Sequence, residues 1–368
     1  MKQISGNTIL FAAGGTGGHI IPALNIARAI GSRARVIFIG SQRGLEHKMV
    51  KEAGFEIVET PIAALPRRIG LSAITFPVKL LYSVAKAISV IKKNNVRAVV
   101  GTGGYASGPA VLAAPIAGVP LILQEQNSIP GITTRVASLW AKRIFLSFPG
   151  SETHLIRSKN TILVGNPVLI PDEIPSRDNA KSRFAMRRDI PLVLITGGSQ
   201  GAASINRTVL KLAKRAEKLP FAILWQTGEK NFDEIASLIK PLKGRLRILP
   251  FIDPMWEAIV AADLVVARAG ALSLAEMAAF GKPSLLVPFP FAAADHQTKN
   301  AKAIEKAGAA VVIRDDEMTA EILENTILKI IGNKEKLSQM AKAAKKLGQP
   351  EALSVIADEI IRIAGGEK

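Results

Sequence analysis

The first residues able to do chemistry form a glycine-rich stretch that ends in a histidine, at positions 14–19. Four glycines in five positions let the backbone turn tightly and remove the Cβ atoms that would hold a ligand away. Backbone N–H groups at the start of a following helix can then bind a phosphate or a developing anion. His19 adds a side chain suited to proton transfer near neutral pH. A plain turn needs fewer glycines, so the stretch predicts a ligand site.

A second glycine-rich stretch, at positions 101–108, also follows a short apolar run. Residues 101–106 match the loose G-x-G-x-x-A pattern of dinucleotide-binding loops, and Glu125 lies at a suitable distance downstream to bind a ribose. The first glycine-rich stretch does not fit that pattern, because Ile20 stands where a third glycine is needed. We therefore do not expect a dehydrogenase.

Three loops in the second half have the same character, each directly after an apolar run. Ser199, within the glycine-rich stretch 197–202, could donate a hydrogen bond to a diphosphate at a helix N-terminus. Glu276 could accept from both hydroxyls of a ribose, or could be an ordinary solvated helix residue. Asp295 is expected to cap a helix, and Gln297 is a neutral side chain able to bind sugar hydroxyls.

Strands and helices must position these loops, and apolar runs of strand length alternate with helical patterns along both halves. The alternation predicts an α/β fold with a doubly wound parallel sheet in each half, and 368 residues suffice for two domains. Ligands of such sheets bind beyond the carboxyl ends of the strands. Strands are expected at residues 8–13, 35–40, 55–61, 98–100, 119–124, 143–148, 161–164, 192–196, 222–225, 246–249, 263–267, 284–287 and 310–313, and helices include 20–27 (Pro22 in the first turn), 45–53, 74–93, 319–347 and 351–363.

The charge of the chain is strongly positive and unevenly distributed. The net charge is +18, and residues 1–165 contain 19 Lys and Arg against 6 Asp and Glu. No acidic residue stands between Glu59 and Glu125. Such a field suggests a polyanionic partner, either nucleic acid or an anionic membrane surface. We do not expect nucleic acid, because this stretch has few aromatic residues and no nucleic-acid-binding motif.

The helix expected at residues 74–93 combines a narrow polar stripe with a wide apolar face. It could pack on the sheet or lie on a membrane surface. The polar stripe consists of Lys79, Ser83, Lys86, Ser89 and Lys93, and the apolar face of Phe76, Leu80, Leu81, Val84, Ile88 and Ile91. We expect Ile69, Leu71, Ile74, Phe76 and Leu80 to insert into a membrane, surrounded by Arg67, Arg68, Lys79 and Lys86.

The chain contains no cysteine, which excludes disulfides and thiolate metal sites but does not indicate a compartment. No signal peptide is evident before the first strand, so we expect a cytoplasmic location. The uncharged span 98–124 is interrupted by glycines and prolines and is not expected to cross a membrane.

Taken together, the motifs resemble those of the family 28 glycosyltransferases that move N-acetylglucosamine from UDP-N-acetylglucosamine onto lipid I in peptidoglycan synthesis. The matching segments follow the order of the family over nearly the whole chain. They are residues 14–19, 101–109, 124–127, 165–168, 197–202, 270–276 and 295–301.

The resemblance implies a GT-B fold, with two Rossmann-like domains facing across a cleft. Residues 1–165 with the C-terminal helix 350–368 would bind the acceptor and the membrane, and residues 166–349 would bind the UDP-sugar. The implied reaction inverts the sugar C1 and transfers it to the MurNAc 4-hydroxyl of undecaprenyl-diphospho-MurNAc-pentapeptide, giving lipid II. The enzyme would work as a peripheral protein on the cytoplasmic face of an anionic membrane, with other cell-wall synthesis proteins as further partners.

The resemblance also implies roles for individual residues. Thr16, Gly17, Gly18 and Asn127 would face the transferred sugar, and Gly14, Gly15, Gly103, Gly104 and Tyr105 the acceptor diphosphate. On the donor side, Ser199 would bind the diphosphate, Ile252 would bind the uracil and Gln297 would bind the sugar hydroxyls. The phosphate and ribose would be bound by Ala271, Leu272, Ser273, Leu274, Ala275 and Glu276. The sequence departs from the family at Leu169, where an arginine contact to the nucleotide is usual.

Catalysis is expected to need a base for the incoming hydroxyl and positive ends of dipoles for the leaving diphosphate. His19 is the first candidate for the base, and Glu125 the second. No Asp-x-Asp motif follows a strand, so we expect no metal and no cofactor. Two alternatives stay open: a UDP-N-acetylglucosamine 2-epimerase, which needs no basic-apolar stretch, and a membrane or nucleic-acid scaffold, which leaves the ligand-type loops unexplained.

Overall fold

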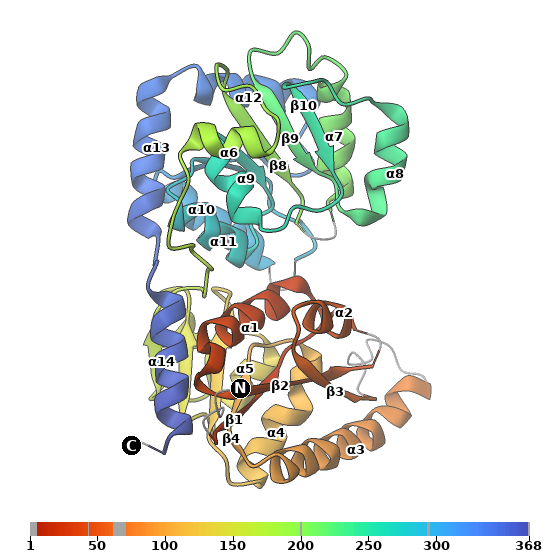
Figure 1. Cartoon of the computed structure of the whole chain (residues 1–368), viewed down its shortest axis with the longest axis vertical. Helices are drawn as coiled ribbons and strands as arrows, with labels where there is room; N and C mark the ends of the chain where they lie inside the picture. The colour runs from red at the N-terminus through yellow and green to blue at the C-terminus, as the bar shows by residue number, and fades with distance from the viewer. Residues whose placement is uncertain (1–5, 43, 62–70, 199–200, 293–294, 367–368) are drawn as a thin grey trace. The chain divides into compact units, whose positions relative to one another are not determined.

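The computed structural model describes residues 6–42, 44–61, 71–198, 201–292 and 295–366, with the backbone alone for residues 71–74. The chain divides into two compact units, Met1–Leu169 with Glu351–Lys368 and Ile170–Pro350 (Figure 1). Each unit contains one parallel sheet with helices on both faces, as the alternation of apolar runs predicts. We describe each unit by itself.

The first unit is built on a parallel sheet of order β3-β2-β1-β4-β5-β6-β7. Its first strand in the chain, β1, is paired on both sides and buried along its whole length, which explains why it reads as a continuous apolar run. The strands are β1 (Thr8–Ala12), β2 (Arg35–Ser41), β3 (Glu56–Thr60), β4 (Val96–Gly101), β5 (Leu121–Glu125), β6 (Arg143–Leu146) and β7 (Thr161–Leu163).

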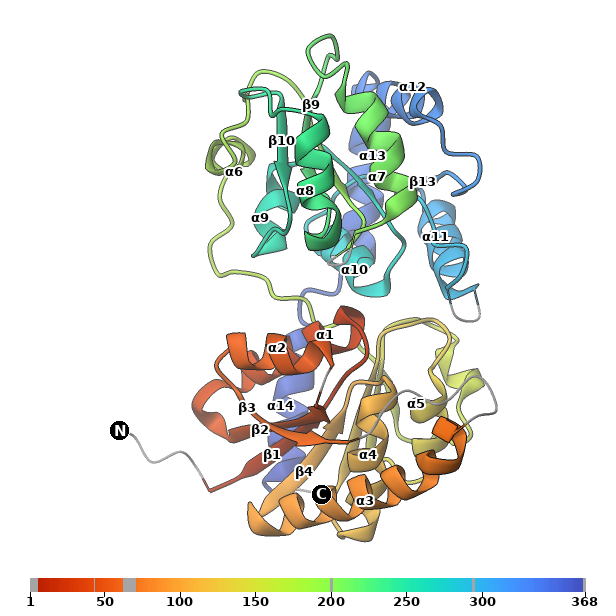
Figure 2. The ribbon, with the colours of Figure 1, turned by 90° about the vertical axis from the view of Figure 1, so that its right-hand side faces the viewer.

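Helices cover both faces of this sheet, and Figure 2 shows the two layers. One layer includes a helix from the far end of the chain, which packs beside the first helix. This layer consists of α1 (Gly17–Ile30), α2 (Leu45–Glu52) and α14 (Ala352–Ala364), and the other of α3 (Leu71–Lys93), α4 (Gly108–Ile116) and α5 (Ile132–Ala137).

The second unit repeats the plan with a sheet of order β10-β9-β8-β11-β12-β13. Its strands are β8 (Leu192–Thr196), β9 (Ala222–Gln226), β10 (Leu246–Leu249), β11 (Leu264–Ala267), β12 (Ser284–Leu286) and β13 (Ala310–Val312). One face is covered by α7 (Ala203–Ala213), α8 (Glu229–Leu238), α12 (Ala320–Ile331) and α13 (Lys334–Leu347), the other by α6 (Arg177–Arg183), α9 (Met255–Ala261), α10 (Ala271–Ala279) and α11 (His296–Lys306).

The first helix begins three residues earlier than the sequence predicts. The carbonyl of Thr16 accepts from the amides of His19 and Ile20, at 3.1 and 3.2 Å, and these two bonds start the helix at Gly17. Pro22 therefore lies in the second turn rather than the first, and its missing N–H leaves the Gly18 carbonyl without a helical partner. Gly18 is exposed, so water can satisfy that carbonyl.

The face that α3 presents to solvent differs from the predicted one. Ser83, expected in the polar stripe, is fully buried, whereas Val78, Leu81 and Tyr82 are 60–70% exposed. The helix is apolar on nearly every side, and the packed face follows Ser83, Ala87 and Val90 at helical spacing. Of the residues expected to insert into a membrane, Phe76 and Leu80 are half-buried, while Ile69 and the side chains of Leu71 and Ile74 lie outside the described residues. Arg67 and Arg68, which are expected to surround them, also lie outside the described residues. None of the described helices is long and apolar enough to cross a membrane.

Candidate active site

Two glycine-rich loops of the first unit meet at the carboxyl ends of the neighbouring strands β1 and β4. Gly103 and Gly104 both have positive φ angles, of 95° and 80°. A Cβ on Gly103 would lie 2.9 Å from Nδ1 of His19, and one on Gly104 would overlap the carbonyl oxygen of Gly14. Glycine is therefore required at both positions by backbone conformation and by the close approach of the first loop.

His19 is held in one tautomer by this junction. Its Nδ1 lies 3.1 Å from the carbonyl oxygen of Thr102 and 2.9 Å from Oε1 of Gln126. The Thr102 oxygen can only accept, so Nδ1 carries the hydrogen and the neutral ring leaves Nε2 as an acceptor. The Gln126 amide is itself fixed, because its Nε2 donates to the carbonyl oxygens of Thr102 (2.8 Å) and Gln124 (3.2 Å). This orientation suits Nε2 to accept a proton from a substrate hydroxyl.

Glu125, the second candidate for the base, is buried at the last position of β5. One carboxyl oxygen accepts from the amide of Asn127 at 3.1 Å and from its side chain at 3.3 Å. The other accepts from the amide of Gly131 at 3.1 Å. These bonds fix the loop that carries Asn127, and they suit Glu125 to positioning that loop rather than to proton transfer.

The remaining predicted residues of the first unit surround the same junction. Thr16 stands at the N-cap of α1 without capping it through its side chain, and Thr16 and Gly18 are exposed while Gly17 is buried. The Tyr105 ring is 38% exposed and packs against Gly15, where an added Cβ would lie 3.3 Å from it. The structure thus brings both glycine loops, Tyr105 and His19 into one place.

The glycine loop of the second unit, after β8, is shaped by close backbone contact. Gly201 has a φ of 76°, and a Cβ there would overlap the carbonyl oxygen of Thr227. Ser199, the predicted diphosphate ligand, lies outside the described residues. The loop leads into α7, whose first-turn amides have no intrahelical partner and receive no side-chain cap, so they can bind an anion.

Gln226, which sequence reasoning did not single out, connects this loop to the predicted uracil site. Its Nε2 donates to Thr196 Oγ1 and to the carbonyl of Gly198, both at 3.1 Å, while its Oε1 accepts from the amide of Ile252 at 2.8 Å. The available signal was an amide side chain at the end of an otherwise apolar, buried strand.

Glu276 lies on α10, whose first turns contain Ala271, Leu272, Ser273, Leu274 and Ala275. Glu276 is half-buried as a residue, and desolvation of its carboxyl by the surrounding atoms raises the pKa to about 7. Within the described part of the chain it accepts no hydrogen bond and pairs with no cation. A desolvated carboxyl without protein partners suits a ligand that brings its own donors, as two ribose hydroxyls would.

Gln297 lies in the first turn of α11, and its Oε1 accepts from the amide of Phe289 at 3.0 Å. Within the described residues its Nε2 makes no hydrogen bond, which leaves it as a donor for a ligand oxygen. Asp295 occupies the N-cap position, as predicted, but with a φ of 54°, and its side chain accepts no capping hydrogen bond. Capping side chains need an extended backbone to reach the first amides of the helix, and a left-handed residue cannot provide it.

Arg268, directly after β11, ties together three loops at the carboxyl end of the second sheet. It donates to the carbonyls at positions 287 and 288, to Asp315 at 2.5 Å and to Ser204 Oγ at 2.7 Å. Its guanidinium also lies 5.4 Å from the centre of the Phe289 ring. The network fixes the loop that precedes Gln297 against the start of α7. An arginine following a buried strand was the only sequence signal for it.

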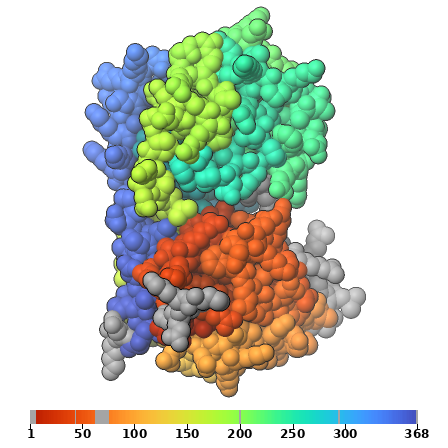
Figure 3. All heavy atoms as spheres, viewed as in Figure 1, coloured from red at the N-terminus to blue at the C-terminus, as the bar shows by residue number. Residues whose placement is uncertain are grey.

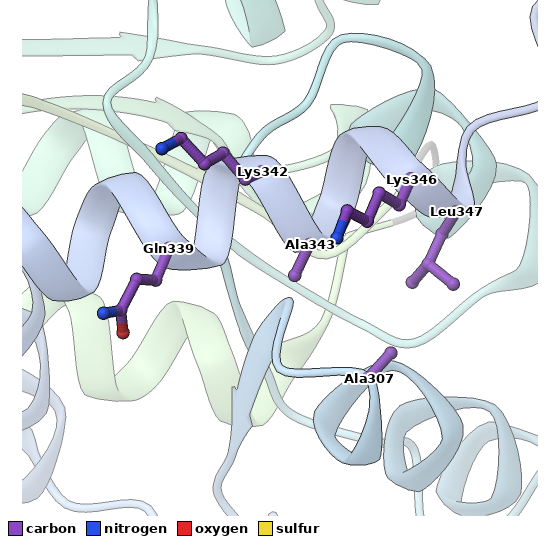
Figure 4. A pocket seen from close by; sticks show the side chains of 6 residues that line it. All are labelled: Ala307, Gln339, Lys342, Ala343, Lys346 and Leu347. Carbon is purple, nitrogen blue, oxygen red and sulfur yellow. The ribbon is translucent and has the colours of Figure 1, made fainter.

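A separate groove of about 410 Å³ lies on the second unit, at the end of α11 opposite to Gln297 (Figure 4). One helix, α13, contributes Gln339, Lys342, Ala343, Lys346 and Leu347, and Ala307 closes the other side. The groove contains none of the predicted site residues. Among the described residues, no cluster of three or more His, Asp or Glu could hold a metal ion.

Two family domains match the chain in the order of its two units. The N-terminal domain of glycosyltransferase family 28 matches residues 9–146, and the C-terminal domain of that family matches residues 192–356. The chain belongs to glycosyltransferase family 28. It is therefore a glycosyltransferase, and the predicted α/β fold class with two GT-B type parallel-sheet domains is confirmed.

Relatives of this family 28 chain are similar over nearly their full length. The UDP-N-acetylglucosamine–N-acetylmuramyl-(pentapeptide) pyrophosphoryl-undecaprenol N-acetylglucosamine transferase of Desulfitobacterium hafniense (strain Y51) is 38% identical over 95% of this chain and 97% of its own length. The crystal structure of Acinetobacter baumannii MurG is 31% identical, with a TM-score of 0.74 over 96% of this chain and 99% of that one. The UDP-GlcNAc 2-epimerase of Neisseria meningitidis, at 15% identity and a TM-score of 0.66 over 96% of this chain and 99% of that one, shares the fold alone.

Proposed function

We propose that the chain transfers N-acetylglucosamine from UDP-N-acetylglucosamine to the MurNAc 4-hydroxyl of lipid I, with inversion at C1, and so makes lipid II. The observation that carries this proposal is the 38% identity, over 95% of the chain, to a transferase named for that reaction. The site geometry supports it, because a histidine with an available acceptor nitrogen stands between two glycine loops of the first unit.

In this reaction His19 Nε2 takes the proton of the MurNAc 4-hydroxyl, whose oxygen attacks C1 of the donor sugar. A new C1–O4 bond forms while the bond from C1 to the β-phosphate oxygen breaks, and UDP leaves with the electron pair. The leaving diphosphate gains negative charge, which the backbone amides at the N-terminus of α7 stabilise. Thr16, Gly17, Gly18 and Asn127 hold the transferred sugar.

Residues 166–349 bind the donor in this proposal. Glu276 accepts from the ribose hydroxyls, and the Nε2 of Gln297 donates to a sugar oxygen. The amide of Ile252 is occupied by Gln226, but its carbonyl accepts no hydrogen bond within the described residues and can bind the uracil N3–H. The family arginine is replaced by Leu169, so UDP binds here without that contact.

Residues 1–165 with 350–368 bind lipid I at the cytoplasmic face of the membrane. The apolar face of α3 formed by Val78, Leu81 and Tyr82 is open to solvent, and α3 forms part of the outer surface of the first unit, in orange, in Figure 3. Lys79 on the same helix is exposed as well, and a basic residue near an anionic surface contributes roughly 1 kcal/mol to binding. Apolar and basic groups on one helix suit peripheral attachment to anionic lipid, which would bring the first unit to the acceptor.

The test is transfer of radiolabel from UDP-N-acetylglucosamine to a lipid I analogue, with product separation that also resolves the free sugar and its 2-epimer. We expect label in the disaccharide lipid, and no epimerised sugar when the acceptor is left out. Label in UDP-N-acetylmannosamine without acceptor would instead identify an epimerase. No conversion in either arm would refute both enzymatic assignments.

A further inference from the structure

A buried carboxyl lies directly beneath the first glycine loop. Glu46, in the first turn of α2, is 1% exposed. Its Oε1 accepts from the amide and the hydroxyl of Ser41, at 2.9 and 2.5 Å, and its Oε2 accepts from the amide of Gly15 at 3.4 Å. A carboxyl is expensive to bury, so its retention at this place calls for a reason beyond packing.

Glycines in three segments leave room for this one carboxyl. A Cβ on Gly14 would lie 2.9 Å from Oε1, one on Gly40 would lie 2.7 Å from Cγ, and one on Gly44 would overlap the carboxyl group itself. The end of β1, the end of β2 and the start of α2 therefore all close around Glu46. The side chain cannot swing away from the loop without displacing backbone.

Glu46 is linked to His19 through a short run of backbone. Gly15 has a φ of 92°, and the next residue, Thr16, accepts the two hydrogen bonds that start α1 and fix the amide of His19. The hydrogen bond from the Gly15 amide to Glu46 therefore fixes the orientation of the peptide that leads into the first turn of α1. It also turns that N–H inward, away from any ligand over the loop.

We propose that Glu46 is a positioning residue for transfer: it fixes the Gly15 peptide and thereby the placement of His19 and of the loop that faces the acceptor. This role rests on the proposed function, since it assigns the loop to the acceptor side. It also removes the Gly15 amide from the expected acceptor-diphosphate donors, which leaves Gly15 as a shape-determining residue there.

The test uses the full chain with Glu46→Gln. The amide keeps the size of the side chain and an oxygen for Ser41, but it sets an N–H against the N–H of Gly15. We expect kcat for transfer to a lipid I analogue to fall at least tenfold, while the affinity for UDP, measured by calorimetry, stays within twofold of wild type. Hydrogen exchange of residues 13–18, followed by mass spectrometry, should become faster.

The matched control is Glu359→Gln in the same unit. Glu359 accepts from Arg143 and Arg362 at the amino end of β6, so its change removes carboxyl bonds away from the glycine loops. We expect this variant to lose thermal stability but to keep kcat and the exchange rate of residues 13–18. Equal loss of kcat in both variants, or unchanged exchange in Glu46→Gln, would overturn the positioning role. If wild type itself does not transfer, the proposed function fails, and the exchange comparison still decides whether Glu46 fixes the loop.

Discussion

Replacing Glu276 with glutamine should stabilise the protein in a way that depends on pH. Burial raises the pKa of this carboxyl from an ordinary 4.5 to about 7, so between these values the folded protein holds a proton that the unfolded chain has released. A carboxyl with a raised pKa does not lower the free energy of unfolding well below pH 4.5, where it is protonated in both states. The loss of stability grows as the pH rises and reaches its full value above pH 7. At about 1.4 kcal/mol for each tenfold, the cost is roughly 3 kcal/mol at pH 8 and about 1 kcal/mol at pH 5.

The measurement is the free energy of unfolding of wild type and Glu276→Gln by denaturant at pH 5 and pH 8. We expect the advantage of the variant to increase by roughly 2 kcal/mol between these pH values. Ser273→Ala, on the same helix and without a titrating group, is the control and should show no such increase.

The affinity for UDP should also depend on the ionisation of Glu276. Ribose hydroxyls donate to the ionised form, so binding should lower the pKa of Glu276 and release a proton near pH 7. Wild-type affinity should then rise roughly tenfold from pH 6 to pH 8 relative to the affinity of Glu276→Gln. The comparison between proteins cancels the titration of the UDP phosphate, which occurs in the same range. An advantage in unfolding that is equal at both pH values, or parallel affinity profiles, would refute the reasoning.

Three further changes test other parts of the site. His19→Ala should reduce turnover about a hundredfold or more and leave UDP affinity unchanged in calorimetry, because it removes the base but no donor contact; activity within a few-fold of wild type would exclude that role. Gln297→Ala should reduce the preference for UDP-N-acetylglucosamine over UDP-glucose and UDP-galactose in competition assays, while the binding of UDP itself persists. An unchanged preference would argue against the sugar contact. Changing Val78, Leu81 and Tyr82 together to serine should reduce co-sedimentation with anionic vesicles and leave transfer to a short water-soluble acceptor unchanged. The control is Leu238→Ser, at an exposed leucine of the second unit. Undiminished sedimentation would place the membrane face elsewhere.

The positions of the loops could be predicted from sequence because their signals are local. An apolar run followed by glycines and a chemically unusual residue marks the carboxyl end of a parallel strand, and His19, Glu276 and Gln297 were found in this way. Strand ends shifted by a residue or two, because pairing rather than composition decides them. Glu125, for example, pairs with Leu146 as the last residue of β5.

Contacts between distant segments could not be predicted in this way. The bond from His19 to Gln126 joins residues 107 positions apart, and it depends on β1, β4 and β5 being neighbours in the sheet. Glu46 was overlooked for the same reason, since its glycine partners belong to three separate segments. The exposed face of α3 was misassigned because a helix apolar on nearly all sides does not indicate which side its neighbours will cover.

The first unit is assembled from both ends of the sequence. Its α14 lies next to α1 and buries Ile356, Ile360 and Ile363, each 0–4% exposed. Burying such a side chain contributes about 1.5–3 kcal/mol, so together these three rival the whole stability of an ordinary domain. A ribosome releases this helix only after all of the second unit has been made. The unit that starts synthesis is therefore the last to be completed, and until then its nascent sheet exposes an apolar face that a chaperone could bind.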